Sequence, residues 1–235
     1  MTRATSARLA GVTYLLYIAL AFPAMVLFDR ATRAQGTPAK LARLAQHASD
    51  VRITVVLSLV TCFAAFVLAV TLYAITRDED RDLALLALTC RVGEGVLNAM
   101  LIVPTMGLLW LATAGTEAGA PDASAANALG AFLLKSRAWG TTTSAALFAV
   151  GSTIFSYLLL RGRMVPVPLA WLGVLASVLV AVLLPAQLAG VVRGPVLDVM
   201  WLPMLAFEIA LGLWLLVKGV ARMPAQPARA TALTG

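Results

Sequence analysis

The chain has 235 residues, of which 61% are hydrophobic and only 12% are charged. A soluble domain is nearer half apolar and a quarter charged, so this composition excludes an ordinary soluble domain and indicates an integral membrane protein. The formal net charge of +7 comes from scattered residues, with no basic strip interleaved with aromatic residues. Membrane lipid, and no nucleic acid, is therefore the expected partner.

Six apolar stretches are long enough to cross a bilayer, for which about 20 residues are needed. They predict an all-α fold, a polytopic membrane bundle of six transmembrane helices that forms one domain over residues 1–221. The predicted spans, in chain order, are residues 9–28, 53–76, 83–112, 138–160, 169–192 and 199–220. The remaining residues, 222–235, are rich in Ala, Pro and Arg and are expected to form a disordered tail.

Two local features modify this simple pattern. Pro104 lies inside the third span, where it predicts a kink because proline has no N–H to donate. Residues 39–44, in the long polar connection between the first two spans, are spaced as in a short interfacial helix.

The sidedness of the bundle follows from the positions of Lys and Arg in the connections. Six spans place both termini on one side, and Lys and Arg are almost equally divided between the two sides. The two shortest connections, at 77–82 and 161–168, both carry arginine. This favours a multi-pass protein of the cell inner (plasma) membrane whose termini are cytoplasmic.

The third span carries ionisable residues at membrane depth. Arg91, Glu94 and Asn98 are spaced by three and four residues and share one helix face, with Thr105 further along it. Charges in a bilayer cost about 2.5–3.5 kcal/mol each on insertion scales and normally face a protein interior or a wet cavity. Glu94, together with Glu208 of the sixth span, is therefore a candidate catalytic acid, and Arg91 is the charge partner of both.

Glu208, in the sixth span, lies at a comparable depth. The helical rise places Glu94 about 16 Å from residue 83, and Glu208 about 15 Å from residue 218, on the same side of the membrane. If the third and sixth spans approach each other, one arginine faces two carboxyl groups. The expected result is one ionised Glu beside Arg91 and one protonated Glu.

Several other polar residues are candidates for lining a ligand pocket beside this cluster. Hydroxyl groups on the fourth span and a lone amide late in the fifth are more commonly helix-packing contacts, but they can also line a cavity. Together with a tryptophan near the start of the sixth span, the ligand-binding candidates are Asn98, Thr105, Thr141, Ser144, Gln187 and Trp201. No Cys or His spacing indicates a metal, and no cofactor is expected.

Three segments resemble a bacterial family of small six-span membrane proteins, domain-of-unknown-function family 4386. They are Arg8-Leu-Ala-Gly-Val-Thr-Tyr14-Leu-Leu, Leu83-Ala-Leu-Leu-Ala…Arg91-Val-Gly-Glu94, and Phe207-Glu208-Ile-Ala-Leu-Gly-Leu-Trp-Leu-Leu-Val-Lys-Gly219. The resemblance implies the six-helix fold and gives weight to Arg91, Glu94 and Glu208. It implies no activity.

Four functional interpretations remain open from the sequence. The charged cluster can be a structural ion pair that fixes helix register. It can also form a polar intramembrane pocket that binds a lipophilic small molecule or lipid, which we take as the leading functional hypothesis. The alternatives are an intramembrane, terpene-cyclase-like enzyme that uses a protonated Glu as general acid on an isoprenoid-like substrate, and a proton-coupled carrier.

Overall fold

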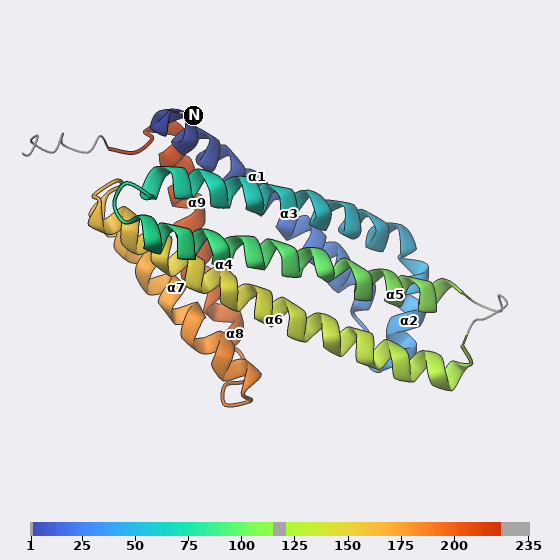
Figure 1. The fold of residues 1–235 in the computed structure, drawn as a ribbon. Helices are drawn as coiled ribbons and strands as arrows, with labels where there is room; N and C mark the ends of the chain where they lie inside the picture. Colours follow the sequence, from blue (N-terminus) through green and yellow to red (C-terminus); the bar gives the residue numbers. More distant parts are fainter. Residues whose placement is uncertain (1, 115–120, 222–235) are drawn as a thin grey trace, which may run out of the picture.

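The computed structural model describes residues 2–114 and 121–221, and all of the regular structure in these ranges is helical (Figure 1). The prediction of an all-α fold is therefore confirmed. The described helices are α1 (Arg3–Thr32), α2 (Thr37–Gln46), α3 (Ala48–Thr76), α4 (Arg81–Met100), α5 (Ile102–Thr113), α6 (Ala123–Arg161), α7 (Val167–Leu188), α8 (Val196–Val199) and α9 (Trp201–Val217).

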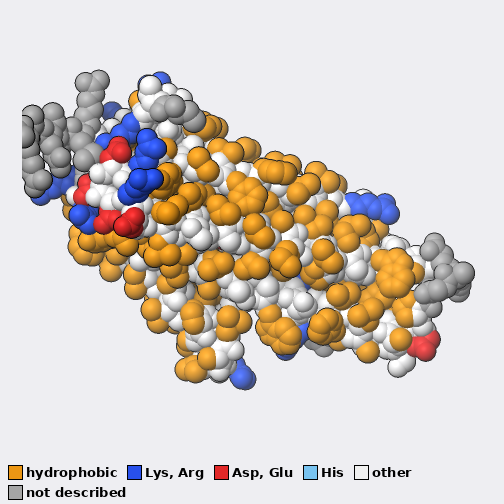
Figure 2. Space-filling view, viewed as in Figure 1, with side chains coloured by type: hydrophobic (Ala, Val, Ile, Leu, Met, Phe, Trp, Pro, Cys, Tyr) orange, Lys and Arg blue, Asp and Glu red, His pale blue; other side chains and the backbone are white. Residues whose placement is uncertain are grey.

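Six helical segments are long and apolar enough to cross a membrane, which confirms the predicted span count. They are α1, α3, α4 with α5, α6, α7, and α8 with α9. Hydrophobic side chains cover most of the visible face of the molecule, and charged side chains gather mainly at its ends (Figure 2). This distribution suits a bundle whose sides contact lipid and whose ends contact water.

The spanning helices pack as a ring in which each packs mainly against two neighbours, with a smaller contact between α3 and α6. The order around the ring is α1, α3, α4, α6, α7, α9 and back to α1. Helices α4 and α9 therefore stand on opposite sides of the ring, and they are not one of the closely packed helix pairs. The third and sixth spans, which carry Arg91, Glu94 and Glu208, face one another across the interior instead of packing side by side.

The kink expected at Pro104 is found as a break at Leu101, between α4 and α5. The amide of Leu101 lies 3.2 Å from the carbonyl oxygens of both Leu97 and Asn98, so the helix tightens there. Because Pro104 has no N–H, the carbonyl of Met100 loses its helical partner and meets the proline ring. The break separates the part of the third span that carries Arg91 and Glu94 from the part that carries Thr105.

The fourth spanning helix is much longer than its apolar stretch. The expected span 138–160 lies inside α6, which has 39 residues and begins after Asp122, whose Oδ1 accepts a hydrogen bond of 2.8 Å from the Ala125 amide. A helix of that length extends about 58 Å, well beyond a hydrocarbon core of about 30 Å. Alanine favours helix without adding much hydropathy, so the apolar stretch underestimates the helix. The extra turns of α6 pack against α2 and α5.

The last two spans end earlier than their apolar stretches. The expected span 169–192 corresponds to α7, which stops at Leu188 because Gly190 adopts φ 73° and closes the helix end. The expected span 199–220 corresponds to α8 and α9, which end at Val217, two residues before Gly219 at φ 72°. The tail predicted at 222–235 lies outside the described residues.

The contact between α1 and α9 closes the ring and depends on glycine. A Cβ atom at Gly11 would lie 2.5 Å from the amide nitrogen of Leu216 and 2.7 Å from the carbonyl oxygen of Gly212. A Cβ atom at Gly212 would in turn lie 3.1 Å from Cβ of Tyr14. The two backbones thus approach as closely as small residues allow in a membrane bundle.

Candidate functional site

The centre of the site is an ion pair on α4 that is almost completely buried. The side chains of Arg91 and Glu94 are 1% and 2% exposed, and Nη1 of Arg91 lies 2.8 Å from Oε2 of Glu94. The angle of this contact does not meet hydrogen-bond geometry, so neither atom has a hydrogen-bond partner among the described residues. The pair neutralises the charge but leaves hydrogen-bonding capacity unused.

Helix α6 supplies the surface against which Arg91 packs. The guanidinium carbon of Arg91 lies 4.5 Å from the centre of the Phe148 ring, which is a cation–π contact. One turn further along α6, Gly151 makes room for the stem of Arg91. A Cβ atom there would lie 2.9 Å from Cγ of Arg91 and 3.1 Å from the carbonyl oxygen of Ala87.

This geometry predicts that Gly151→Ala destabilises the protein by about 1–3 kcal/mol, because the added methyl forces Arg91 out of its packed position. The matched control is Gly140→Ala on the same helix, whose Cβ would meet only the flexible end of Leu101 at 2.5 Å. Because alanine favours helix by about 1 kcal/mol over glycine, the control is expected to be neutral or slightly stabilising. Chemical unfolding in detergent measures both variants, and equal effects would contradict the packing of Arg91 against Gly151.

Hydrogen bonds from two other helices hold the polar face of α4. The hydroxyl of Tyr17, on α1, donates to Oε1 of Glu94 at 3.0 Å. The hydroxyl of Ser144, on α6, lies 2.8 Å from Oδ1 of Asn98 and 3.2 Å from the carbonyl oxygen of Glu94. Tyr17 and Arg91 therefore fix the direction of the Glu94 carboxylate, and Ser144 holds Asn98 and the backbone of α4.

Glu208 approaches the same region from α9, on the opposite side of the ring. It is 7% exposed, and its Oε1 has no hydrogen-bond partner among the described residues. It lines a cavity of about 210 Å³, which we call the inner cavity. The residues that line the inner cavity are Tyr17, Glu94, Asn98, Thr141, Ser144, Ala145, Phe148, Trp201 and Glu208.

The structure thus brings together most of the residues singled out from the sequence. Both acids lie on the inner cavity, together with four of the ligand-binding candidates, and Arg91 contacts it through Glu94. Two candidates lie elsewhere. Thr105 follows the break at Leu101 and lines a second cavity. Gln187 is near the end of α7 and is not among the lining residues of either cavity.

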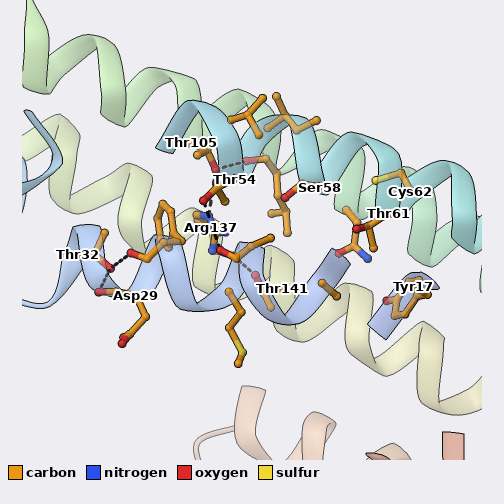
Figure 3. Close-up of a pocket in the computed structure, with 18 residues that line it drawn as sticks. Tyr17, Asp29, Thr32, Thr54, Ser58, Thr61, Cys62, Thr105, Arg137 and Thr141 are labelled. Carbon is orange, nitrogen blue, oxygen red and sulfur yellow. Dashed lines mark hydrogen bonds between the residues drawn. The ribbon is translucent and has the colours of Figure 1, made fainter. Parts of the chain in front are cut away.

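The second cavity, which we call the outer cavity, has a volume of about 430 Å³ and is lined by residues of α1, α3, α4, α5 and α6 (Figure 3). It shares Tyr17, Asn98 and Thr141 with the inner cavity, so the two are adjacent. Arg137 on α6 points into it toward Thr105 (Figure 3) and donates a hydrogen bond of 3.1 Å from Nε to the threonine hydroxyl.

A protein-family model, described as a domain of unknown function (DUF4386), matches residues 9–219. The chain belongs to the DUF4386 family. This confirms the family suggested by the three resembling segments, and no curated protein and no solved structure matches the chain. The DUF4386 description names no activity, so the chemistry has to be argued from the residues of the site.

The sequence did not single out three residues that shape the site of this DUF4386 protein. Tyr17 bonds to Glu94, Phe148 stacks on Arg91, and Arg137 lies on the outer cavity. Arg137 had a usable signal, since a lone arginine near the end of an apolar stretch is a candidate interfacial group. The other two are aromatic residues in apolar spans, which usually only pack.

The chemical capacity of the inner cavity follows from its lining. Two carboxyl groups and one guanidinium group lie beside the rings of Phe148 and Trp201, whose centres are 6.3 Å apart. One carboxyl, Glu94, already has a cation and a hydroxyl as partners. The other carboxyl, Glu208, has an Oε1 atom with no hydrogen-bond partner among the described residues, so it can accept a further hydrogen bond.

Proposed function

We propose that this membrane protein binds a lipophilic small molecule or lipid in the inner cavity, through a hydrogen-bond donor of the ligand that meets Glu208. The observation that carries the proposal is the buried Oε1 of Glu208, which has no hydrogen-bond partner among the described residues and lies on a cavity. A buried polar atom left without a partner costs about 1–3 kcal/mol, so a ligand that satisfies it gains that free energy.

The lining also supports an apolar body with one polar group. Phe148, Ala145 and Trp201 provide apolar surface in the lining, and Ser144 and the two carboxyl groups provide polar contacts. Small-molecule sites are typically mostly apolar with a few placed polar groups. A hydroxyl or amine on a hydrophobic molecule matches this arrangement, because both groups donate hydrogen bonds to a carboxyl.

Mass spectrometry of molecules that co-purify with the protein tests the proposal. We expect the wild-type protein to carry a lipophilic molecule enriched over the bulk lipid, and Glu208→Leu to lose it by about tenfold or more. The matched control is Leu205→Ala on the same helix, where Leu205 is 39% exposed on the bundle surface. Equal amounts of the molecule in wild type and in folded Glu208→Leu would contradict the proposal.

One observation favours an enzyme as a second candidate. The Glu208 carboxyl, whose Oε1 has no hydrogen-bond partner among the described residues, lies on the same cavity as the Phe148 and Trp201 rings. A protonated carboxyl can start an isoprenoid-like cyclisation, and aromatic faces can stabilise the cation that forms. In that case the molecule extracted from the wild type would differ in structure from the molecule extracted from Glu208→Gln. A proton-coupled carrier has no comparable support among the described residues.

We also propose that the protein lies in the cell inner membrane with both termini in the cytoplasm. It is supported by Arg77 and Arg161, which lie at the two short connections on the side of the termini. Protease access to the N-terminal segment from the cytoplasmic side would check it, and protection from that side would contradict it.

A further inference from the structure

The outer cavity contains a cation, Arg137, that no carboxylate of the described residues neutralises. Among the described residues, no Asp or Glu oxygen lies within 4.0 Å of the Arg137 guanidinium. Asp29 lines the same cavity, but its Oδ2 is 2.7 Å from Nη2 of Arg33 and is already paired. The charge of Arg137 therefore remains available to an anion.

The guanidinium of Arg137 is held in a fixed position. Its carbon lies 3.7 Å from the centre of the Phe28 ring, and its Nε donates to Thr105 at 3.1 Å. Neither terminal nitrogen has a hydrogen bond within the described part of the chain. A planar guanidinium that is stacked on one side and free at its terminal nitrogens is suited to bidentate contact with a phosphate.

The depth of Arg137 matches a layer of lipid headgroups. Residues 137 and 161 are about 36 Å apart along the continuous helix α6. The hydrocarbon core is about 30 Å thick and the whole bilayer about 40–45 Å. With Arg161 at one surface, Arg137 lies at the headgroup level of the opposite leaflet. Trp139, which lies two residues further along α6 and is 52% exposed, is the kind of residue found at that level.

The cavity is also open to the lipid side and offers further donors. Met25, which is 60% exposed, contributes to its lining, so a lipid can enter from the bundle surface. Ser58 and Asn98 line the cavity, and neither the Ser58 hydroxyl nor the Asn98 amide nitrogen makes a hydrogen bond to other described residues. They can donate to an anion beside Arg137.

We infer that the outer cavity is a binding site for the phosphate of an anionic membrane lipid, with Arg137 as its main contact. This inference goes beyond the proposed function, because it needs neither Glu208 nor the inner cavity. The lipid chains lie against the exposed apolar surface beside Met25, and the phosphate lies between Arg137 and the polar side chains of α3 and α4.

Native mass spectrometry of delipidated protein, titrated with defined probes, tests the inference. The probes are dioleoyl phosphatidylglycerol, dioleoylglycerol, which has the same chains and no phosphate, and inorganic phosphate. We expect phosphatidylglycerol to bind most tightly, and Arg137→Gln to weaken its binding about tenfold or more. The matched control Lys135→Gln removes an equal charge two positions away and is expected to change binding little.

Each alternative result has a defined meaning. Two results contradict Arg137 as the phosphate contact. One is equal binding of phosphatidylglycerol to the wild type and to Arg137→Gln, and the other is a loss of binding in Lys135→Gln as large as in Arg137→Gln. Tight binding of dioleoylglycerol shows that chains alone suffice, and full displacement by inorganic phosphate shows a soluble-anion site; both overturn the lipid assignment. If Arg137→Gln does not fold, Thr105→Val keeps the charge but removes the acceptor that positions Nε, and it is expected to weaken binding by a smaller factor.

Discussion

Glu94→Gln is expected to lower the free energy of unfolding by about 3–5 kcal/mol, because it leaves a buried arginine without its anionic partner. Arg91 is 1% exposed and has its ion-pair contact with Glu94 at 2.8 Å. The substituted amide keeps nearly the same shape, so the loss reflects charge and not a cavity. Titration with a denaturing detergent, followed by circular dichroism, measures the change.

Two further variants separate this effect from ordinary packing loss. The double variant Arg91→Met, Glu94→Met removes both charges and is expected to be more stable than Glu94→Gln, because well-packed apolar residues can replace a buried pair. The control Glu79→Gln removes the negative charge from the 3.0 Å contact with Arg161, whose side chain is 46% exposed and also contacts Asp80 at 3.4 Å, and is expected to cost about 1 kcal/mol or less. A loss in Glu94→Gln no larger than in Glu79→Gln would contradict the buried pair.

Gly11→Ala is expected to destabilise the bundle by about 2–3 kcal/mol, because its methyl group would meet backbone atoms of α9. The added Cβ would lie 2.5 Å from the Leu216 amide nitrogen and 2.7 Å from the Gly212 carbonyl oxygen. Backbone atoms cannot rotate away as a side chain can, so α1 and α9 must separate. The same detergent titration measures the loss of stability.

The matched control for this close contact is Gly93→Ala on α4. Its Cβ would meet only Cδ1 of Leu147 at 3.1 Å, the flexible end of a side chain. We expect this variant to be close to neutral, since the leucine can move and alanine favours helix. If Gly11→Ala were as stable as Gly93→Ala, the ring would not close through α1 and α9 as described.

The sequence predicts the architecture well because apolar length decides whether a segment can cross a bilayer. It predicts helix ends poorly, because hydropathy and helix formation are different properties. The alanine-rich start of α6 continues the helix 15 residues before the expected position 138. A glycine at positive φ ends α7 at Leu188 although the apolar residues continue.

The part of the site that lies on a single helix can be predicted from the sequence. Arg91, Glu94 and Asn98 follow from their spacing on one helix. Glu208 could be matched only by depth, because the ring places α4 and α9 opposite each other and only the folded bundle shows this. Tyr17 binds Glu94 across 77 positions of sequence, a contact that no local pattern contains.

Thr105 shows how one local feature changes such a prediction. Its spacing from Asn98 puts it on the polar face of an uninterrupted helix. The break at Leu101 starts a new helix, and the hydroxyl of Thr105 accepts its hydrogen bond from Arg137. The polar face therefore divides between two adjacent cavities.

A structural role for the charged cluster and a binding role lead to different results. A cluster that only holds helices together requires stability to fall in Glu94→Gln, with no change in bound molecules. A binding pocket requires, in addition, that Glu208→Leu loses a molecule while the protein remains folded. Glu208 distinguishes the two roles because its Oε1 has no hydrogen-bond partner within the described part of the chain. Replacing Glu208 therefore breaks no hydrogen bond of Oε1 inside the bundle, and a lost molecule would report on binding.

The most direct test of the binding proposal is an experimental map of the protein in a lipid nanodisc, inspected at the inner cavity. We predict elongated density beside Trp201 and Phe148, with one end within hydrogen-bond distance of Glu208, and its loss in Glu208→Leu. An inner cavity that contains only water, or that is closed by side chains packed around Glu208, would contradict the proposal.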